Sequence, residues 1–276
     1  MKKFTIVPKA GLANRMRAIA SGIFITKSFD SQAILYWIKK SECNAAFEEL
    51  FAPLQLEKIS IITVGPNKFT ILPPSKKNLY IFHLLRMLIY KKQINNFNKN
   101  DGNIFDLLPL HGNIYLSSCH SMAPHYPLKE LFIPTKEINT SIDLVKSKFS
   151  SFVVGIHIRR TDNVQAIKKN SVDDFKSQIN KLLENNPEMK FFLATDSNQV
   201  KNDLIKSYGE SIIIHEAVLH RDSLQGMKDA VVDLWCLSST KYIIGSYYSS
   251  FSELAAELGG IELIIIESTL KNDDFL

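Results

Sequence analysis

The chain has 276 residues, enough for one large or two medium domains, and its 45% hydrophobic and 22% charged residues are typical of a folded globular protein. Lys and Arg number 33 against 28 Asp and Glu, which gives a formal net charge of +5. That mild excess suits an anionic small molecule or an anionic surface. Because we find no basic stripe with interleaved aromatic residues, we expect no nucleic-acid partner.

The cysteines and the N-terminal segment bear on the cellular compartment. Cys43, Cys119 and Cys236 are scattered along the chain, which is typical of a reducing compartment and not of a disulfide framework. The first residues have only a four-residue apolar core before Pro8, unlike a signal peptide, and no apolar run approaches membrane-spanning length. We therefore expect a cytoplasmic protein with at most peripheral membrane contact.

The N-terminal residues predict a strand–helix–strand unit. A strand over 4–7 is followed by a turn, and from Asn14 apolar residues recur at helical spacing until a second strand over 33–37. The turn, Gly11-Leu-Ala-Asn-Arg15, would point backbone N–H groups and a helix N-terminus at a ligand. Only Gly11 in it is glycine, so it is a weak dinucleotide signal.

The remainder of the first half is less regular. The predicted elements are a helix over 42–51, a strand over 59–64, a variable connection with some helix over 65–112, and a strand over 114–118. Three nearby histidines, His111, His120 and His125, invite interpretation as a metal site. Neither helical His-x-x-x-His spacing nor a carboxylate accompanies them, so we expect no metal there.

From residue 136 onward strands alternate with helices. The predicted strands are 152–158, 190–194, 212–215, 242–245 and 263–266, and the helices between them begin near Ser171, Ser197, Leu224 and Ser250. Such alternation predicts a doubly wound parallel sheet. A polar stretch with a helix over 136–149 precedes it. We therefore predict two α/β domains, 1–135 and 136–276.

The run from Val153 to Asp162 is the most informative stretch. Its apolar part is typical of a strand buried on both faces, and His157, Arg159 and Arg160 follow at or just past the carboxyl end. Ligand crevices form at that edge of open α/β sheets, and two adjacent guanidiniums suit phosphate or diphosphate. The alternative is a pair of surface arginines held by Asp162.

Two other predicted strand ends carry polar residues. One strand runs into Thr195-Asp196-Ser197, and another runs into a serine-rich turn that ends in Ser249-Ser250 at a helix start. Simple N-capping explains either turn equally well. Arginines and hydroxyl-rich helix starts on one sheet edge together favour an anion-binding crevice.

These residues resemble the motif series of GDP-fucose-dependent fucosyltransferases. The motifs are, in order, Gly155-Ile-His-Ile-Arg-Arg-Thr-Asp162, Ala194-Thr-Asp196, Ser223 with Gly226 and Asp233, and Ser249-Ser250-Phe251. They are most similar to those of core alpha-1,6-fucosyltransferases and nodulation fucosyltransferases, and less so to those of protein O-fucosyltransferases. The resemblance covers about 152–260 and, through the Gly11-Leu-Ala-Asn-Arg15 turn, the first strand–helix–strand unit.

The resemblance implies a GT-B-like fold in which two Rossmann-like domains face each other across a cleft. The C-terminal domain would hold the nucleotide sugar. His157 and Asp233 would contact the guanosine, Arg159 would hold the diphosphate, and Ser249 and Ser250 would line the same pocket.

The remaining candidates are assigned around that donor. Asp196 would belong to the donor pocket, and Arg160 would act with Arg159 and Asp162 in catalysis. Gly11, Asn14 and Arg15 would lie on the acceptor side of the cleft.

One departure from the family affects the general base. The family carries a catalytic glutamate five residues after the motif aspartate and a lysine directly after that aspartate, and these positions here are Ile167 and Asn163. The base therefore does not transfer from the family. Asp162 is a candidate base and, equally, a structural partner of the arginines.

We interpret the chain as an enzyme that transfers fucose or a related deoxysugar from a GDP-sugar to a saccharide or lipid-linked saccharide with inversion. Fixed arginines would stabilise the charge on the leaving diphosphate. No two aspartates are spaced as in the metal-binding Asp-x-Asp motif, so we expect neither a divalent metal nor a cofactor. The alternatives are another nucleotide-sugar donor or a non-catalytic nucleotide-sugar or glycan-binding protein. A Rossmann oxidoreductase is disfavoured because no Gly-x-Gly-x-x-Gly opens either half.

Overall fold

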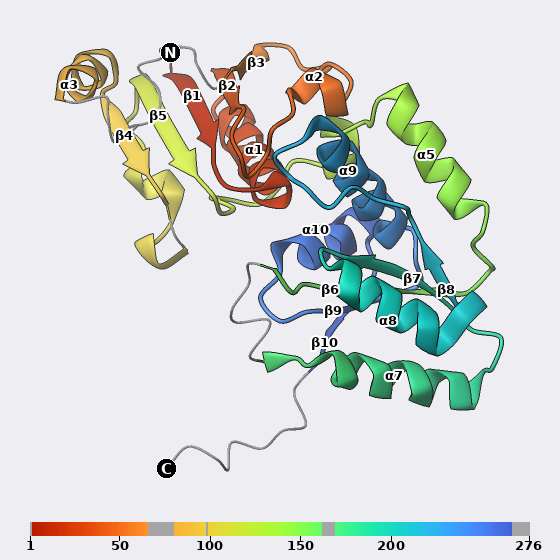
Figure 1. The fold of residues 1–276 in the computed structure, drawn as a ribbon. Helices are drawn as coiled ribbons and strands as arrows, with labels where there is room; N and C mark the ends of the chain where they lie inside the picture. The colour runs from red at the N-terminus through yellow and green to blue at the C-terminus, as the bar shows by residue number, and fades with distance from the viewer. Residues whose placement is uncertain (1, 66–79, 98, 162–168, 267–276) are drawn as a thin grey trace. The chain divides into compact units, whose positions relative to one another are not determined.

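The computed structural model describes residues 2–65, 80–97, 99–161 and 169–266 (Figure 1). The chain divides into two compact units, the first comprising Met1–Thr135 and Arg221–Met227 and the second comprising Lys136–His220 and Lys228–Leu276. The return segment Arg221–Met227 has no counterpart in the single boundary expected from the sequence. Each unit is described by itself below.

The first unit is built on a five-stranded parallel sheet. Its strands are β1 (Lys2–Pro8), β2 (Gln32–Ile38), β3 (Ile59–Val64), β4 (Lys92–Asn95) and β5 (Gly112–Ser118), in the order β3-β2-β1-β5-β4. The predicted strands β1, β2, β3 and β5 are confirmed. The sequence missed β4, whose four residues are mostly polar and lie at the edge of the sheet.

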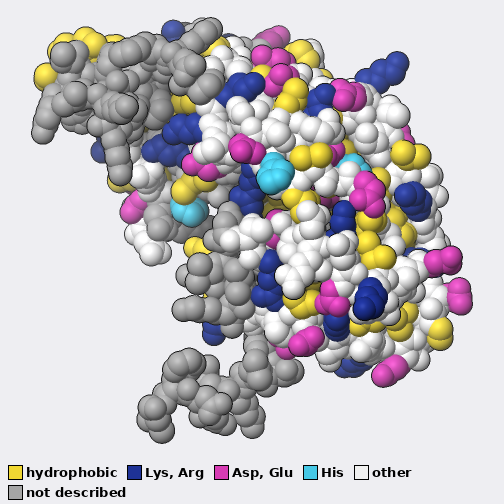
Figure 2. Space-filling view, viewed as in Figure 1, with side chains coloured by type: hydrophobic (Ala, Val, Ile, Leu, Met, Phe, Trp, Pro, Cys, Tyr) yellow, Lys and Arg dark blue, Asp and Glu magenta, His cyan; other side chains and the backbone are white. Residues whose placement is uncertain are grey.

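Helices of very different character pack on this sheet. They are α1 (Leu12–Ser28), α2 (Phe47–Leu50), α3 (Tyr80–Ile89) and α4 (Leu128–Leu131), with short 3-10 turns at Lys99–Asp101 and Ile104–Leu107. Four residues of the predicted stripe of α1 are buried, namely Met16, Ile19, Ala20 and Ile23, whereas Phe24 is half-buried and Lys27 is exposed. By contrast, α3 exposes apolar side chains, and Figure 2 shows hydrophobic side chains on the surface where Figure 1 places α3.

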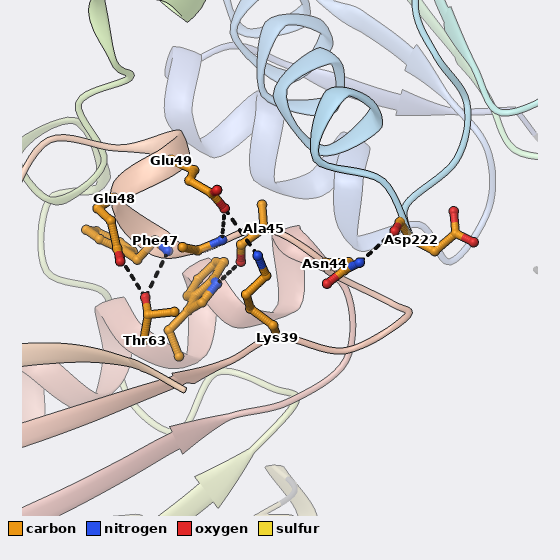
Figure 3. Close-up of polar contacts among 10 residues, drawn as sticks. Lys39, Asn44, Ala45, Phe47, Glu48, Glu49, Thr63 and Asp222 are labelled. Atoms are coloured by element: carbon orange, nitrogen blue, oxygen red, sulfur yellow. Dashed lines mark hydrogen bonds and ion pairs between the residues drawn. The ribbon is translucent and has the colours of Figure 1, made fainter. Parts of the chain in front are cut away.

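The helix predicted over 42–51 is wrong except for the four residues of α2. Backbone groups before α2 are bonded elsewhere, because Lys40 and Cys43 form an antiparallel bridge and the Trp37 Nε1–H donates to the Ala45 carbonyl at 2.7 Å. Asn44 also contacts the return segment, since its backbone N–H donates to the Arg221 carbonyl. Its Nδ2 donates to the Asp222 carbonyl (Figure 3). Non-helical partners therefore stop the helix from extending toward β2.

The second unit is a second parallel sheet of five strands, as predicted. Its elements are α5 (Lys136–Lys146), β6 (Val153–Ile158), α7 (Val172–Asn185), β7 (Lys190–Thr195), α8 (Asn198–Tyr208), a 3-10 turn (Gly209–Ser211), β8 (Ile212–Ile214), α9 (Leu224–Ser238) from Lys228 onward, β9 (Ile243–Gly245), α10 (Ser250–Gly259) and β10 (Leu263–Ile265). The strand order is β10-β9-β6-β7-β8. All six residues of the central strand β6 are buried, which explains why His157 is its one polar side chain.

Local signals set several boundaries in this unit. The capping box expected at Ser171 is present, because the Ser171 Oγ accepts from the Asp174 N–H and the Asp174 carboxylate accepts from the Ser171 N–H. Gly260, in the left-handed region at φ 64°, ends α10. Among the described helices, none is both long enough and apolar enough to cross a bilayer.

Gly155 in β6 allows the end of α9 to pack closely on the sheet. A Cβ at this position would lie 2.8 Å from the Thr240 Oγ1 and 3.1 Å from the Leu237 Cδ2. We expect Gly155→Ala to lower the free energy of unfolding by about 1–3 kcal/mol, the usual cost of overpacking a core. Urea denaturation followed by circular dichroism measures it.

Gly65 provides the matched control, because a Cβ there meets nothing within 4 Å and the backbone has no positive φ. Gly65→Ala should leave the unfolding free energy within about 0.5 kcal/mol of the parent value. Equal stability of the two variants would contradict the packing argument.

Candidate active site

The candidate site lies where the direction of strand addition reverses in the second sheet. From β6 the chain adds β7 and β8 on one side and then β9 and β10 on the other, so β6 and β9 are neighbours at the switch point. Crevices for ligands form beside the carboxyl ends of strands at such points. The predicted site residues at the ends of β6, β7 and β9 thus share one edge of one sheet.

Ser246 joins the ends of β6 and β9. Its backbone N–H donates to the His157 carbonyl at 3.0 Å, and its Oγ donates to the same carbonyl at 3.3 Å. The same Oγ accepts from the Arg159 N–H at 3.0 Å. Ser246 is 1% exposed, so these bonds are shielded from water. They fix the backbone of Arg159, to which its side chain is attached.

Asp196, at the end of β7, holds the next two residues. One carboxylate oxygen accepts from the Arg160 N–H at 2.7 Å. The other accepts from the Thr161 N–H at 3.3 Å and from the Thr161 Oγ1 at 2.7 Å. Asp196 therefore positions the loop after β6, whereas its predicted direct contact with a donor stays a prediction. The cap of α8 is Ser197, whose Oγ accepts from the Val200 N–H.

His157 and Arg160 show how the loop is surrounded. The His157 ring is buried and stacks on the Phe251 ring of α10, with centroids 5.1 Å apart and planes at 29°. Burial lowers the pKa of the Arg160 guanidinium, against the charges of Asp174 and Asp196, which raise it. An arginine remains protonated under such conditions, so a cation lies at this edge.

The turn before α10 leaves a buried hydroxyl available. Ser249 occupies the N-cap position, but its side chain makes no capping hydrogen bond, and its Oγ is buried without a hydrogen-bond partner among the described residues. Ser250 is the first residue of the helix. An unsatisfied hydroxyl beside the free N–H groups of a helix start is a feature that an anionic ligand would explain.

Two further residues give this turn its shape. The Tyr247 N–H donates to the Asn170 Oδ1 at 2.8 Å, and the Asn170 Nδ2 donates to the Ile266 carbonyl. Gly245 permits α10 to approach β9, because a Cβ there would lie 2.9 Å from the Ser252 Oγ. The sequence did not single out Asn170, because a lone polar residue before a helix cap does not reveal partners that are distant in the sequence.

Asp233 belongs to a mostly buried cluster beside β8. Its carboxylate lies 3.4 Å from the His215 Nδ1, and the Asp229 carboxylate lies 3.7 Å from the His215 Nε2 and accepts from the Val218 N–H. Asp229 and Asp233 are four residues apart on α9, so both face the same histidine. The predicted guanosine contact of Asp233 stays a prediction. The sequence missed His215 and Asp229, although the i, i+4 spacing of the carboxylates was a signal.

The charges of this cluster are coupled. Burial lowers the pKa of His215, but Asp233, Asp229 and Glu216 raise it more, so that the folded value lies above the ordinary 6.5. Burial raises the pKa of Asp233, which His215 opposes. The imidazolium form of His215 thus ties the loop after β8 to α9.

The acceptor-side candidates lie in the first unit, at the turn after β1. Gly11 precedes α1 with φ −74°, so the backbone does not require glycine there. Arg15 departs from its predicted role, because its guanidinium is 1% exposed and donates to the carbonyls of Ala10 and Ile38, both at 2.7 Å. Asn14 is half-buried, and its predicted acceptor contact stays a prediction.

Other predictions concern the base and a metal. Asp162, Asn163 and Ile167 lie outside the described residues. Within the described ranges, no three His, Cys, Asp or Glu side chains gather as a metal site. The His125 Nε2 lies 2.7 Å from the Ser121 Oγ, and the His111 Nε2 lies 3.4 Å from the Lys91 Nζ.

Comparison with known proteins decides the family. The sequence profile described as "Alpha-(1,6)-fucosyltransferase N- and catalytic domains" matches residues 115–262, more than half of the chain. The chain belongs to this family. It is therefore a glycosyltransferase of the fucosyltransferase type. No curated protein sequence matches it significantly.

Solved fucosyltransferase structures share the fold of this family member. The alpha-1,6-fucosyltransferase NodZ soaked with GDP-fucose has a TM-score of 0.65 at 17% identity, covering 100% of this chain and 98% of that one. A variant of Arabidopsis thaliana FUT1 with GDP has a TM-score of 0.63 at 16% identity, covering 95% and 69%. POFUT1 with GDP has a TM-score of 0.55 at 12% identity, covering 95% and 98%.

The matched segment of this fucosyltransferase contains the whole candidate donor site. His157, Arg159, Asp196, Asp233 and Ser249 all lie within 115–262. The acceptor-side candidates of the first unit lie outside it. The family assignment thus rests on the end of the first unit, from residue 115, and on the second unit up to residue 262.

The His215 cluster predicts how stability depends on pH. A group whose pKa is raised on folding stabilises the fold below its unfolded pKa, and this contribution is lost as pH rises through the folded pKa. We expect His215→Gln to lower the free energy of unfolding by about 1–3 kcal/mol below pH 6.5 and by less at higher pH. Denaturation at a series of pH values measures this difference.

The exposed His111 provides the control, and His111→Gln should leave the free energy of unfolding within about 0.5 kcal/mol of the parent value. A cost of His215→Gln that grows as pH rises would contradict the assignment of an imidazolium between the two carboxylates.

Proposed function

We propose that this family member transfers fucose, or a closely related deoxysugar, from a GDP-sugar to a glycan hydroxyl with inversion and without a metal ion. The observation that carries the proposal is the shared sheet edge, where the Arg159 backbone is fixed by Ser246 and the buried Ser249 hydroxyl lies at the start of α10. Solved relatives with GDP and GDP-fucose support a guanosine-diphosphate sugar as the donor.

The proposed reaction is a single displacement at the anomeric carbon. The oxygen of an acceptor hydroxyl forms the new bond while the bond to the diphosphate oxygen breaks, and that oxygen keeps the electron pair. Arg159, with Arg160 beside it, would stabilise the negative charge that develops on GDP. The hydroxyl proton leaves to a base that is not assigned, since Ile167 replaces the family's glutamate and Asp162 is supported by sequence alone.

The donor pocket is proposed from named contacts. His157, stacked on Phe251, offers a flat buried surface for the nucleotide. Ser249 and Ser250 would bind diphosphate oxygens together with the first N–H groups of α10. We further propose that the two α/β units are the Rossmann-like domains of a GT-B-like enzyme, in which the first unit receives the saccharide or lipid-linked saccharide acceptor.

A non-catalytic nucleotide-sugar-binding protein is the second candidate, favoured by Ile167 and Asn163 at the family's Glu and Lys positions. Thermal-shift titration with GDP, UDP, CMP-sugars and NAD tests the ligand class, because a specific ligand stabilises by mass action. A shift with UDP or NAD but not with GDP would overturn the donor assignment. Binding of GDP-fucose without turnover would favour the non-catalytic candidate.

Arg159→Ala tests the role of the guanidinium. Losing the guanidinium should remove about 3 kcal/mol of transition-state stabilisation, as for one oxyanion-type contact. The rate of GDP-fucose turnover should therefore fall roughly a hundredfold. Turnover by the parent protein should be unchanged by EDTA. Initial rates of GDP release, with and without EDTA, measure both.

Lys206, an exposed cation on α8 of the same unit, provides the matched control, and Lys206→Ala should keep full turnover. Arg159→Ala activity within a few-fold of the parent, or loss of parent activity in EDTA, would overturn the corresponding part of the proposal.

A further inference from the structure

Helix α3 of the first unit exposes its apolar side chains and buries its charged one, the reverse of an ordinary surface helix. Its one charged residue, Arg86, is 4% exposed, while Leu84 is 57%, Met87 59% and Leu88 83% exposed. Leu85 and Ile89 are exposed as well. Surface helices normally bury the apolar side and expose the charged side. Five exposed large apolar residues on one short helix therefore require a partner.

The inner side of α3 already has its packing. The Arg86 guanidinium lies over the Tyr115 ring of β5, 5.5 Å from its centroid. One turn later, the Tyr90 ring meets the Tyr115 ring edge-on, and the Tyr90 OH donates to the Thr5 Oγ1 of β1. The helix is thus held to the sheet by polar and aromatic contacts. Its apolar arc, formed by Leu84, Leu85, Met87, Leu88 and Ile89, remains exposed.

The charge around α3 is strongly one-sided. No acidic residue occurs between Glu57 and Asp101. The basic residues in that interval are Lys58, Lys68, Lys76, Lys77, Arg86, Lys91, Lys92 and Lys99. Lys91 and Lys92, directly after α3, are exposed. An exposed apolar arc is therefore followed by exposed cations and has no acidic residue near it in the chain.

We propose that α3 binds the surface of an anionic phospholipid bilayer, with its apolar arc in the headgroup region and Lys91 and Lys92 on lipid phosphates. A bilayer offers both requirements, an apolar layer and a negative surface. A second copy of the chain would bring two acid-free basic segments together, which opposes association. A nucleic acid would match the charge but not the aliphatic arc. The proposal is independent of the donor chemistry.

Vesicle co-sedimentation tests the proposal. The parent protein should bind phosphatidylcholine vesicles that contain phosphatidylglycerol, should bind phosphatidylcholine alone at least tenfold less, and should be released by salt. Leu84→Ser combined with Leu88→Ser should lower the bound-to-free ratio on anionic vesicles at least tenfold. Lys91→Gln combined with Lys92→Gln should also lower it and weaken its salt dependence.

A matched control exists on α5, where Leu144 is 67% exposed and Lys146 and Lys148 are exposed beside it. Leu144→Ser with Lys146→Gln and Lys148→Gln should bind vesicles like the parent. Circular dichroism and the GDP-dependent thermal shift should be equal in all variants, which separates this test from that of the donor site.

Three results would overturn the proposal. They are no binding to anionic vesicles, an equal loss of binding in the α5 control, and dimers of the parent protein without lipid that the Leu84 and Leu88 substitutions abolish. The last result would assign the arc to a second copy of the chain.

Discussion

The proposed donor site depends on how the backbone of residues 159–161 is held after β6. Ser246, from the end of β9, bonds the Arg159 N–H, and Asp196, from the end of β7, bonds the N–H groups of Arg160 and Thr161. Because β6 lies between β7 and β9, both neighbours reach its carboxyl end. Three successive backbone N–H groups after β6 are thereby anchored. Arginines that stabilise a developing charge are effective only when such preorganisation keeps them in place.

The start of α10 at the same sheet edge is less stable than an ordinary capped helix start. Ser249 stands at the N-cap of α10 without capping it, and a missing cap bond costs a helix about 1 kcal/mol. Its buried Oγ adds the cost of an unsatisfied polar atom. By contrast, Ser171 and Ser197 cap α7 and α8 in the ordinary way. The helix start that faces the switch point is thus the one whose serine is left for another partner.

The sequence predicted best what depends on local pattern. The strands of the second sheet and the Ser171 cap follow from apolar runs and short-range polar spacing, and they are confirmed. Placement of polar residues at the ends of β6, β7 and β9 follows from the same pattern. Strand β4 was missed because an edge strand of polar residues has no hydrophobic signal, and only pairing with β5 defines it.

Long-range partners could not be read from the pattern. Asp233 and His215 lie 18 positions apart in the chain and meet only because β8 and α9 pack together. The sequence predicts Arg15 on the acceptor side. Arg15 lies one helical turn before Ile19 of the apolar stripe, however, and that spacing was a signal that it faces the interior. Its rigid guanidinium bonds two backbone carbonyls, Ala10 and Ile38, so the cation is satisfied without a carboxylate.

The positive charges behind the net charge of +5 are concentrated in one part of the chain. The interval between Glu57 and Asp101 contributes +8, so the remaining residues together carry −3. Composition suggested a diffuse excess, but the excess is confined to one interval of the first unit, outside the segment that matches the family profile. Long-range attraction to an anionic surface depends on such local density and not on the total. The matched segment is therefore proposed to hold the donor, and the basic interval around α3 is proposed to bring the protein to an anionic bilayer, where a lipid-linked acceptor would be found.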